Sequence, residues 1–355
     1  MTHILAAGDH FVTPSLFTDA IRERTPGAPV TFSELTLPWP HEPFSRIGTV
    51  DEASGDVPEL IEALAGAQIA VTQMAAFTGE VFAASPELCL IGVCRGGPVN
   101  VDLDAATEAG VIVSFAPGRN AVAAAEFAIG LMLTAMRRVV TTDSELKAGV
   151  WRGDYYAYEN AGIELDGSTV GLIGYGAIGS IVSRVLRAFG AHVLTYDPYA
   201  NAEAIAADGV ELVSLEDLLR RSSVVSLHAR LTAETHHLLN AGNLALLPHG
   251  AVLVNSARGG LLDYAPLPDL LGSGAIGALA LDVYDIEPPP PEWPLFGAPN
   301  VVMTPHLAGA TRQTAERAAN IVADDVARYL AGEVPRFVAN PAVLERPALA
   351  GLVRR

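Results

Sequence analysis

The sequence predicts an α/β protein built from two doubly wound parallel-sheet domains. Short β-branched runs alternate with helical patterns along the whole chain, as in parallel βαβ units. Most of these runs are almost continuously apolar, which is typical of strands covered by helices on both faces. At about 150 residues per domain, the 355 residues correspond to two domains.

The first third of the chain carries one series of predicted strands. We expect strands at His3–Ala7, Val30–Glu34, Ile69–Gln73, Leu88–Val93 and Val111–Phe115, with helical patterns that include Val57–Leu64 and Asp102–Ala109. The segment Ala121–Val140 follows and is apolar almost all round. We therefore expect a helix that is buried on every side, either between domains or at a subunit interface.

A second series begins at Ser168. Its expected strands are Thr169–Ile173, His192–Tyr196, Val224–Leu227, Ala251–Asn255, Ala278–Asp282 and Val301–Thr304. A last helix is expected at Thr311–Leu330, and the proline-containing tail Glu333–Arg355 is expected to wrap around a domain. We place crossings between domains near residues 120 and 310, so that the chain returns to the first domain at its C-terminal end.

The composition excludes several classes of protein. Half of the residues are hydrophobic, 17% are charged and the mean hydropathy is +0.32, so the chain can bury a large core. A net charge of −18 and the absence of any basic run longer than two residues argue against nucleic-acid and anionic-membrane partners. No apolar run is long enough to span a bilayer, and Met1–Ile4 lacks a basic signal-peptide start. We expect a cytoplasmic protein.

The segment Gly174–Gly179 has the pattern Gly-x-Gly-x-x-Gly between an apolar strand and an amphipathic helix. In this βαβ setting the pattern predicts a turn that binds a pyrophosphate. Gly174 makes the tight turn, Gly176 lets the backbone approach the anion, and Gly179 lets the helix pack closely on the strand. The helix N-terminus supplies free N–H groups and the positive end of a dipole.

An aspartate ends the next predicted strand. Asp197 lies 18 residues beyond Gly179, where its carboxylate can accept hydrogen bonds from both ribose hydroxyls of a dinucleotide. A carboxylate at this place repels a 2′-phosphate. The sequence therefore predicts that the cofactor is NAD and not NADP.

Three polar segments lie at or just beyond predicted strand ends. They contain Arg258 (Val254–Asp263), Glu287 (Leu281–Pro288) and His306 (Met303–Gly309). Because the carboxyl ends of parallel strands line the ligand crevice, these three side chains are expected to converge beside the cofactor. A guanidinium pairs with a carboxylate through two hydrogen bonds, and a histidine transfers a proton near neutral pH. This set suits the binding of a carboxylate and the transfer of a proton, and it needs no metal.

With the glycine turn and Asp197, these segments resemble the D-isomer-specific 2-hydroxyacid dehydrogenase family. The resemblance runs from about residue 88 to 340. It implies a Rossmann NAD-binding domain, residues 120–310, inserted into a flavodoxin-like substrate-binding domain formed by residues 1–119 and 311–355. It also implies hydride transfer between nicotinamide and a D-2-hydroxy acid or 2-oxo acid.

The resemblance assigns roles to single residues. His306 is the acid/base, Glu287 its hydrogen-bond partner, and Arg258 binds the substrate carboxylate and carbonyl. Arg95–Asp102 resembles the substrate-carboxylate loop, with Arg95 and the backbone of Gly96 and Gly97 as contacts. Further cofactor contacts are implied at Gly174, Tyr175, Gly176, Ala177, Ile178, Gly179, Asp197, His228, Ala229, Ser256, Ala257, Asp282 and Gly309, with Asp282 on the nicotinamide amide.

Two alternatives stay open at this point. The first is D-3-phosphoglycerate dehydrogenase, although Val71–Ala76 carries no cation for a phosphate where phosphoglycerate members often have an arginine. The second is a non-catalytic NAD-sensing regulator, which would keep the same three residues. The identity of the acid is not predicted.

The remaining features give weaker expectations. Cys89 and Cys94 are expected to be packing thiols, and His236–His237 and Asp9–His10 are expected to be solvated residues and not metal ligands. Tyr155, Tyr156 and Tyr158 either cap a pocket or pack against a loop. An exposed Ala121–Val140 helix would form a large apolar patch through Phe127, Leu131 and Met132, so we expect a homodimer with these helices near the interface.

Overall fold

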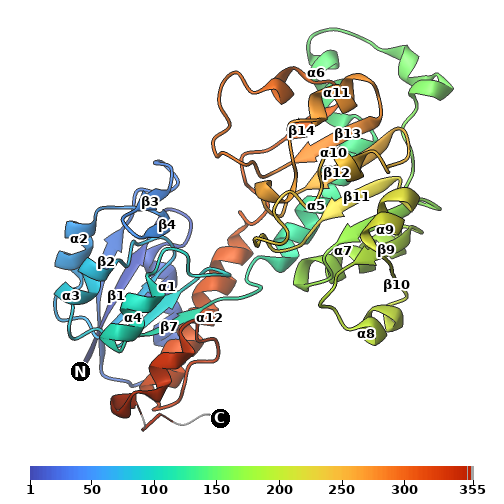
Figure 1. Cartoon of the computed structure of the whole chain (residues 1–355). Coiled ribbons are helices and arrows are strands. Elements are labelled where there is room, and N and C mark those ends of the chain that lie inside the picture. The colour runs from blue at the N-terminus through green and yellow to red at the C-terminus, as the bar shows by residue number, and fades with distance from the viewer. Residues whose placement is uncertain (350, 353–355) are drawn as a thin grey trace. The chain divides into compact units, whose positions relative to one another are not determined.

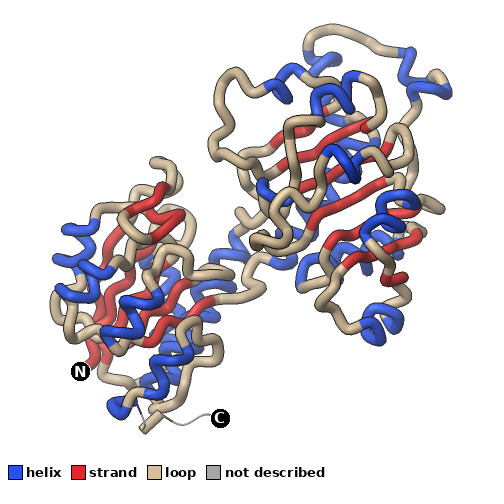
Figure 2. The backbone as a smooth tube through the Cα atoms, viewed as in Figure 1, coloured by secondary structure: helices blue, strands red, loops and turns tan. Residues whose placement is uncertain are grey.

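The computed structural model describes residues 1–349 and 351–352 and divides the chain into two compact units (Figure 1). Unit 1 comprises Met1–Asn120 and Ala310–Arg355, and unit 2 comprises Ala121–Gly309. Each unit has its own parallel sheet with helices on both faces (Figure 2). The predicted fold class is confirmed. In the described part of the chain, no helix is both long and apolar enough to cross a membrane.

Unit 1 is built on a five-stranded parallel sheet in the order β2-β1-β5-β6-β7. Its strands are β1 (Thr2–Gly8), β2 (Val30–Thr36), β5 (Ile69–Thr72), β6 (Leu90–Val93) and β7 (Ile112–Phe115), and a small antiparallel pair is formed by β3 (Ser45–Ile47) and β4 (Val50–Ala53). Helices α1 (Pro14–Arg24) and α12 (Arg312–Leu330) pack on one face; α2 (Val57–Ala63), α3 (Gly79–Ala84) and α4 (Leu103–Ala109) pack on the other. The strand order reverses between β1 and β5.

The tail after α12 packs along β7 through the buried side chain of Asn340. Asn340 Oδ1 accepts from the Val113 N–H at 2.9 Å, and its Nδ2 donates to Val111 O at 2.9 Å. Short 3₁₀ turns follow at Pro341–Glu345 and Pro347–Leu349. The tail thus lies against unit 1 as far as it is described; Ala350 and residues 353–355 lie outside the described residues.

Unit 2 is built on a seven-stranded parallel sheet in the order β10-β9-β8-β11-β12-β13-β14. The strands are β8 (Thr169–Ile173), β9 (His192–Tyr196), β10 (Glu211–Leu212), β11 (Val224–Leu227), β12 (Ala251–Asn255), β13 (Ile276–Leu281) and β14 (Val301–Met303). The helices are α5 (Ala121–Met136), α6 (Val139–Lys147), α7 (Ala177–Ala188), α8 (Ala202–Ala207), α9 (Leu215–Arg221), α10 (Ala241–Leu244) and α11 (Leu267–Gly272). The order reverses between β8 and β11, which is where open parallel sheets bind ligands.

The prediction of one helix over Ala121–Val140, buried on every side, is wrong. α5 ends at Met136, Arg138 adopts a left-handed φ of 50°, and α6 starts in a new direction at Val139. The loop that returns to this point packs closely on the end of α5, since a Cβ on Gly162 would lie 2.4 Å from Met136 O. α5 packs on α7, β12 and β13 of its own unit, and Val122 remains 43% exposed.

Candidate functional site

The glycine turn connects β8 to α7 at the point where the sheet order of unit 2 reverses. Gly174 has a φ of 101°, and a Cβ there would lie 2.7 Å from Ala229 N. A Cβ on Gly179 would lie 2.3 Å from Gly174 O, so only glycine allows this packing of α7 on the turn. A Cβ on Gly176 would meet no atom within 4 Å. Packing within the chain therefore does not require glycine at position 176. The open space there leaves room for a ligand to approach the backbone.

Asp197 ends β9 beside this turn, and hydrogen bonds from the backbone fix its carboxylate. Its Oδ2 accepts from the Tyr175 N–H at 2.8 Å, and its Oδ1 accepts from the Tyr199 N–H at 3.0 Å. The Tyr175 hydroxyl donates to Asp208 Oδ2 at 2.9 Å. The structure thus brings Asp197 and the glycine turn together, as a site for a ribose next to a pyrophosphate requires.

His228 and Ala229 follow β11 and lie against Gly174 and Gly179. Burial lowers the pKa of His228 to about 4, so its ring is neutral at pH 7. Its Nε2 is buried and has no hydrogen-bond partner among the described residues. A buried nitrogen without a hydrogen-bond partner, near the point where the strand order reverses, fits a site that binds a dinucleotide.

The loop after β12 positions Arg258. Asn255, fully buried at the strand end, donates to Arg258 O at 2.9 Å and accepts from the Ala257 N–H at 3.1 Å. A Cβ on Gly259 would lie 2.0 Å from Tyr284 O, so this loop packs tightly on the loop that carries Glu287. The Arg258 guanidinium donates to Ala257 O at 2.7 Å and is otherwise exposed. Ser256 and Ala257 lie in the same loop.

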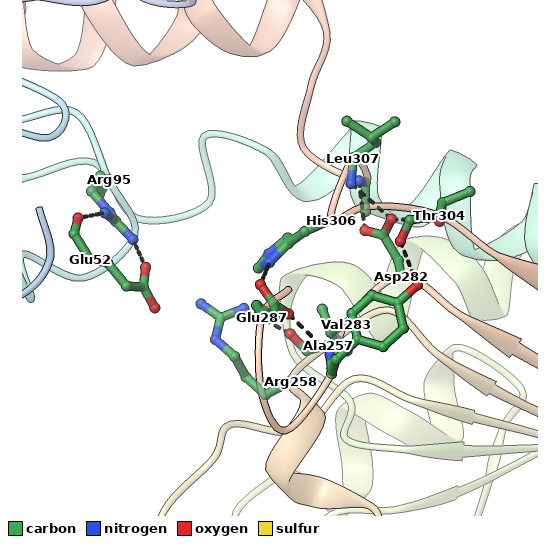
Figure 3. Close-up of polar contacts among 12 residues, drawn as sticks. Glu52, Arg95, Ala257, Arg258, Asp282, Val283, Glu287, Thr304, His306 and Leu307 are labelled. Atoms are coloured by element: carbon green, nitrogen blue, oxygen red, sulfur yellow. Dashed lines mark hydrogen bonds and ion pairs between the residues drawn. The ribbon is translucent and has the colours of Figure 1, made fainter. Parts of the chain in front are cut away.

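Glu287 and His306 form a direct pair, which Figure 3 shows beside Arg258. His306 Nδ1 lies 2.7 Å from Glu287 Oε2, while Glu287 Oε1 accepts from the Tyr284 N–H at 3.0 Å. The His306 side chain is 39% exposed and that of Glu287 is 23% exposed. His306 has a φ of 55°, a strained value for a non-glycine residue that is typical of functional sites.

The pair shifts both pKa values toward the charged forms. The hydrogen bond and the charge of Glu287 raise the pKa of His306, and together they outweigh burial and the positive charge of Arg258. Burial alone would raise the pKa of Glu287, but the hydrogen bond and charge of His306 lower it overall. This arrangement can hold a proton on an imidazole near neutral pH and release it from the other ring nitrogen.

Asp282 orients the segment that carries His306. It is fully buried at the end of β13, and its Oδ1 accepts from Thr304 Oγ1 at 2.6 Å and from the Leu307 N–H at 2.8 Å. Its Oδ2 accepts from the Ala308 N–H at 2.8 Å, one residue before Gly309. Figure 3 shows Asp282 beside Thr304 and Leu307. The structure therefore gives Asp282 a positioning task. Its contact with the nicotinamide amide stays a prediction.

The predicted substrate loop lies in unit 1, after β6. The Arg95 guanidinium forms an ion pair with Glu52 and also donates to Glu52 O at 3.0 Å. Gly96 and Gly97 have open space at the Cβ position, and among the described residues neither backbone N–H donates a hydrogen bond. These two N–H groups are thus available to a ligand, whereas the charge of Arg95 is largely matched by Glu52.

Sequence reasoning missed the residues that hold this geometry. Asn255, Tyr284 and Thr304 contribute hydrogen bonds that position Arg258, Glu287 and the His306 segment. The only local signal was the polar residue at the end of β12. Tyr156 is 97% and Tyr158 96% exposed, so neither packs within unit 2, while the Tyr155 hydroxyl donates to Glu145 Oε1 at 3.2 Å. Over the described residues, no His, Cys, Asp and Glu cluster could hold a metal ion.

Comparisons with known proteins place this geometry in a family. The family model for the D-isomer-specific 2-hydroxyacid dehydrogenase NAD-binding domain matches residues 129–308. The D-3-phosphoglycerate dehydrogenase of Mycobacterium leprae is 42% identical over 254 residues, which are 72% of this chain but only 47% of that protein. The glyoxylate reductase of Korarchaeum cryptofilum is 37% identical over 266 residues, 75% of this chain and 80% of that protein.

A solved structure agrees with these matches. The TT0316 protein of Thermus thermophilus superposes with a TM-score of 0.77 and 31% identity, covering 96% of this chain and all of that one. The chain spans about half the length of the phosphoglycerate dehydrogenases that it matches. The chain belongs to the D-isomer-specific 2-hydroxyacid dehydrogenase family, with the family's NAD-binding domain in unit 2.

Proposed function

We propose that the protein is an NAD-dependent oxidoreductase that interconverts a D-2-hydroxy acid and the corresponding 2-oxo acid. The observation that carries this proposal is the pair of His306 and Glu287, 2.7 Å apart, in the same unit as a dinucleotide turn. Family membership supports it. In this proposal unit 2 binds the cofactor and unit 1 binds the substrate.

The proposed cofactor site uses features that already fit NAD. The pyrophosphate would lie over the N-terminus of α7, where Tyr175, Ala177 and Ile178 surround the open position at Gly176. The ribose hydroxyls would donate hydrogen bonds to the carboxylate of Asp197. We propose further contacts from His228, Ala229, Ser256, Ala257 and Gly309. Bound NADH supplies the hydride that reduces the 2-oxo carbon.

His306 is the proposed acid/base. Its Nδ1 is held by Glu287, so Nε2 is the nitrogen that faces the reaction. In reduction, protonated His306 donates from Nε2 to the carbonyl oxygen as the carbon receives the hydride. In oxidation, the neutral ring accepts the hydroxyl proton at the same atom. Glu287 stabilises the imidazolium in both directions.

The substrate carboxylate is assigned to cationic and backbone donors. The exposed guanidinium of Arg258 can bind a carboxylate through two hydrogen bonds and polarise the adjacent carbonyl. Arg95 and the unused N–H groups of Gly96 and Gly97 are the proposed contacts from unit 1. The 42% identity to D-3-phosphoglycerate dehydrogenase makes 3-phosphoglycerate the second candidate substrate.

A turnover panel tests the proposal. Purified protein with NADH is offered a series of 2-oxo acids, including 3-phosphohydroxypyruvate, and the loss of NADH absorbance is followed. Turnover on at least one acid supports the proposal, and loss of that turnover in His306→Ala with NADH affinity retained supports the role of His306. NADH binding without turnover on any acid would instead indicate a sensing regulator.

We also infer a homodimer, as the sequence predicted. Leu131 and Met132 of α5 are buried within the chain, so the inference depends on other exposed residues. The segment from α6 to Asn160 exposes Leu146 (57%), Trp151 (83%), Tyr156 (97%) and Tyr158 (96%). Solvent-exposed aromatic residues gathered in one short segment are typical of subunit contacts. The cytoplasmic location and the absence of nucleic-acid and membrane partners stay predictions from composition.

A further inference from the structure

Strand β2 lies at one edge of the five-stranded sheet in unit 1, beside β1 (Figure 1). Hydrogen bonding alternates along a strand, so the bonds at both ends of β2 show which residues face β1. Pro29 O accepts from the start of β1, and the Leu37 N–H donates to its end. The residues in between with the opposite parity are Phe32, Glu34 and Thr36. Their backbone N–H and C=O groups therefore point away from the sheet.

The free side of β2 lacks the features that usually keep sheet edges apart. The strand contains neither proline nor lysine, and it pairs with β1 residue for residue without a bulge. In the part of the chain that the structure describes, no group outside β1 bonds to the backbone of Phe32, Glu34 or Thr36. A regular edge of this kind can pair with a strand of another molecule.

The side chains next to this edge carry opposite charges. Phe32 packs on the same face of the sheet as α1, and the Arg22 guanidinium of α1 lies 4.9 Å from the centre of its ring. The ion pair of Arg22 is an exposed contact with Asp19 at 3.4 Å, and the exposed Glu34 forms no ion pair with a described residue. Glu34 points to the same face as Phe32 because it is two residues away. An open groove of about 540 Å³ runs here, and Arg22, Thr31 and Phe32 are part of its lining.

We propose that β2 is a contact between two copies of this chain, which pair antiparallel through their β2 strands about a two-fold axis at Ser33. In this register Phe32 of each copy lies opposite the partner's Glu34, and each such pair exchanges two backbone hydrogen bonds. Directly opposite residues of antiparallel strands point to the same face. The partner's Glu34 therefore lies beside the Phe32 ring, within reach of Arg22, and two equal ion pairs join the copies.

The registers on either side fit less well. An axis at Glu34 would set the two Glu34 carboxylates opposite each other, where like charges repel. An axis at Phe32 would set Glu34 opposite Val30, whose N–H already donates to Ala28 O at 2.9 Å. That register would also leave Arg22 without the partner's carboxylate. Of the three registers, the one centred on Ser33 uses the free backbone groups and both free charges, as a self-complementary two-fold contact requires.

This β2 contact is small, because each copy contributes a single strand edge. Interfaces of this size are weak and transient. We expect the β2 strands to be separate at micromolar concentration and paired near millimolar concentration. The exposed segment around Trp151 belongs to unit 2 and β2 to unit 1, so the two contacts are separate surfaces. Where both form, the β2 contact joins dimers into larger assemblies.

The first test reverses the charges and follows association by sedimentation velocity from micromolar to near-millimolar concentration. Glu34→Arg brings two cations together and Arg22→Glu two carboxylates, so each should raise the Kd of the β2 contact about tenfold or more. The double variant Arg22→Glu/Glu34→Arg should restore association. Glu108→Arg is the control with the same change of net charge as Glu34→Arg; its helix α4 packs beside β7, at the other end of the sheet, so association should not change.

The second test removes a backbone donor of the contact. The Glu34 N–H points away from β1, so Glu34→Pro leaves the bonds to β1 in place. We expect Glu34→Pro to lose association at an almost unchanged unfolding temperature. Glu34→Ala, which lacks the charge but keeps the N–H, should lose less. Ser33→Pro removes an N–H that faces β1 and should instead lower the unfolding temperature.

Two results would overturn the inference. The first is a wild-type protein whose sedimentation coefficient shows no association over this range of concentration. The second is an association that survives both Glu34→Arg and Glu34→Pro, since it must then use another surface. Thermal unfolding of each variant shows whether a lost association comes from a lost fold, and recovery in the double charge variant decides if a single variant is unstable. None of these measurements uses enzyme activity, so they are independent of the proposed function.

Discussion

Gly176 and Gly179 belong to one motif, yet the structure gives them different reasons to be glycine. A Cβ at 179 would lie 2.3 Å from Gly174 O, a distance that packed atoms do not adopt, so Gly179→Ala must push α7 away from the turn by about 1 Å. Overpacking of this kind costs about 1–3 kcal/mol of unfolding free energy. For a domain of this size the Tm falls by about 2–4 °C per kcal/mol.

A Cβ at 176 meets nothing within 4 Å, and the φ of −85° suits alanine. Gly176→Ala should therefore unfold at the wild-type temperature. If a pyrophosphate approaches this backbone, the added methyl group blocks it, and the Kd for NADH should rise at least tenfold, or by about 1.4 kcal/mol. One glycine thus serves folding and the other serves binding.

The assay measures thermal unfolding without cofactor and NADH affinity by fluorescence titration for both variants. Gly130→Ala, at an exposed position of α5 with free space around it, is the control and should change neither quantity unfavourably. A Gly179→Ala protein as stable as wild type, or a Gly176→Ala protein that binds NADH normally, would refute this division of tasks.

Four further results are expected. Glu287→Gln removes the charge that raises the pKa of His306. Reductive turnover needs the protonated ring, so it should fall off at lower pH than in wild type, while oxidation gains over the same pH range. An unshifted pH profile, measured where the chemical step limits the rate, would contradict this. His306→Ala should lower turnover by about 10²–10⁴-fold with little effect on NADH affinity. Asp197→Ser should relax the preference for NADH over NADPH, and a wild type that prefers NADPH would show that Asp197 has been misinterpreted. Trp151→Asp should yield monomers in sedimentation velocity, whereas Tyr199→Asp, equally exposed outside that segment, should not.

The parallel strands could be predicted because a strand that is buried on both faces has a continuous apolar run in its sequence. Strands such as β5, β6, β11 and β12 are buried at every position, and the predicted strands begin and end within two residues of the observed ones. The pair β3–β4 and the two-residue β10 were not predicted, since they are short and carry no continuous apolar run.

Features that depend on contacts between residues far apart in the chain could not be predicted from the sequence. The end of α5 at Met136 is packed against Gly162, which lies 26 residues further along the chain. Motif spacing pointed to Glu287 and His306, but the buried bonds of Asp282 to Leu307 and Ala308 span 25 and 26 residues and follow no local pattern.

The interrupted course of unit 1 has a consequence for how the chain acquires its structure during synthesis. Unit 2 is continuous, so the ribosome releases everything that its core requires once Gly309 has emerged. Unit 1 must wait, because the apolar face of α1, with Phe17 and Ile21, is covered by α12, and β7 gains the Asn340 bonds later still. Residues before Ala121 are therefore made before unit 2 but belong to the unit that closes after it, and they spend a longer time exposed to chaperones and proteases.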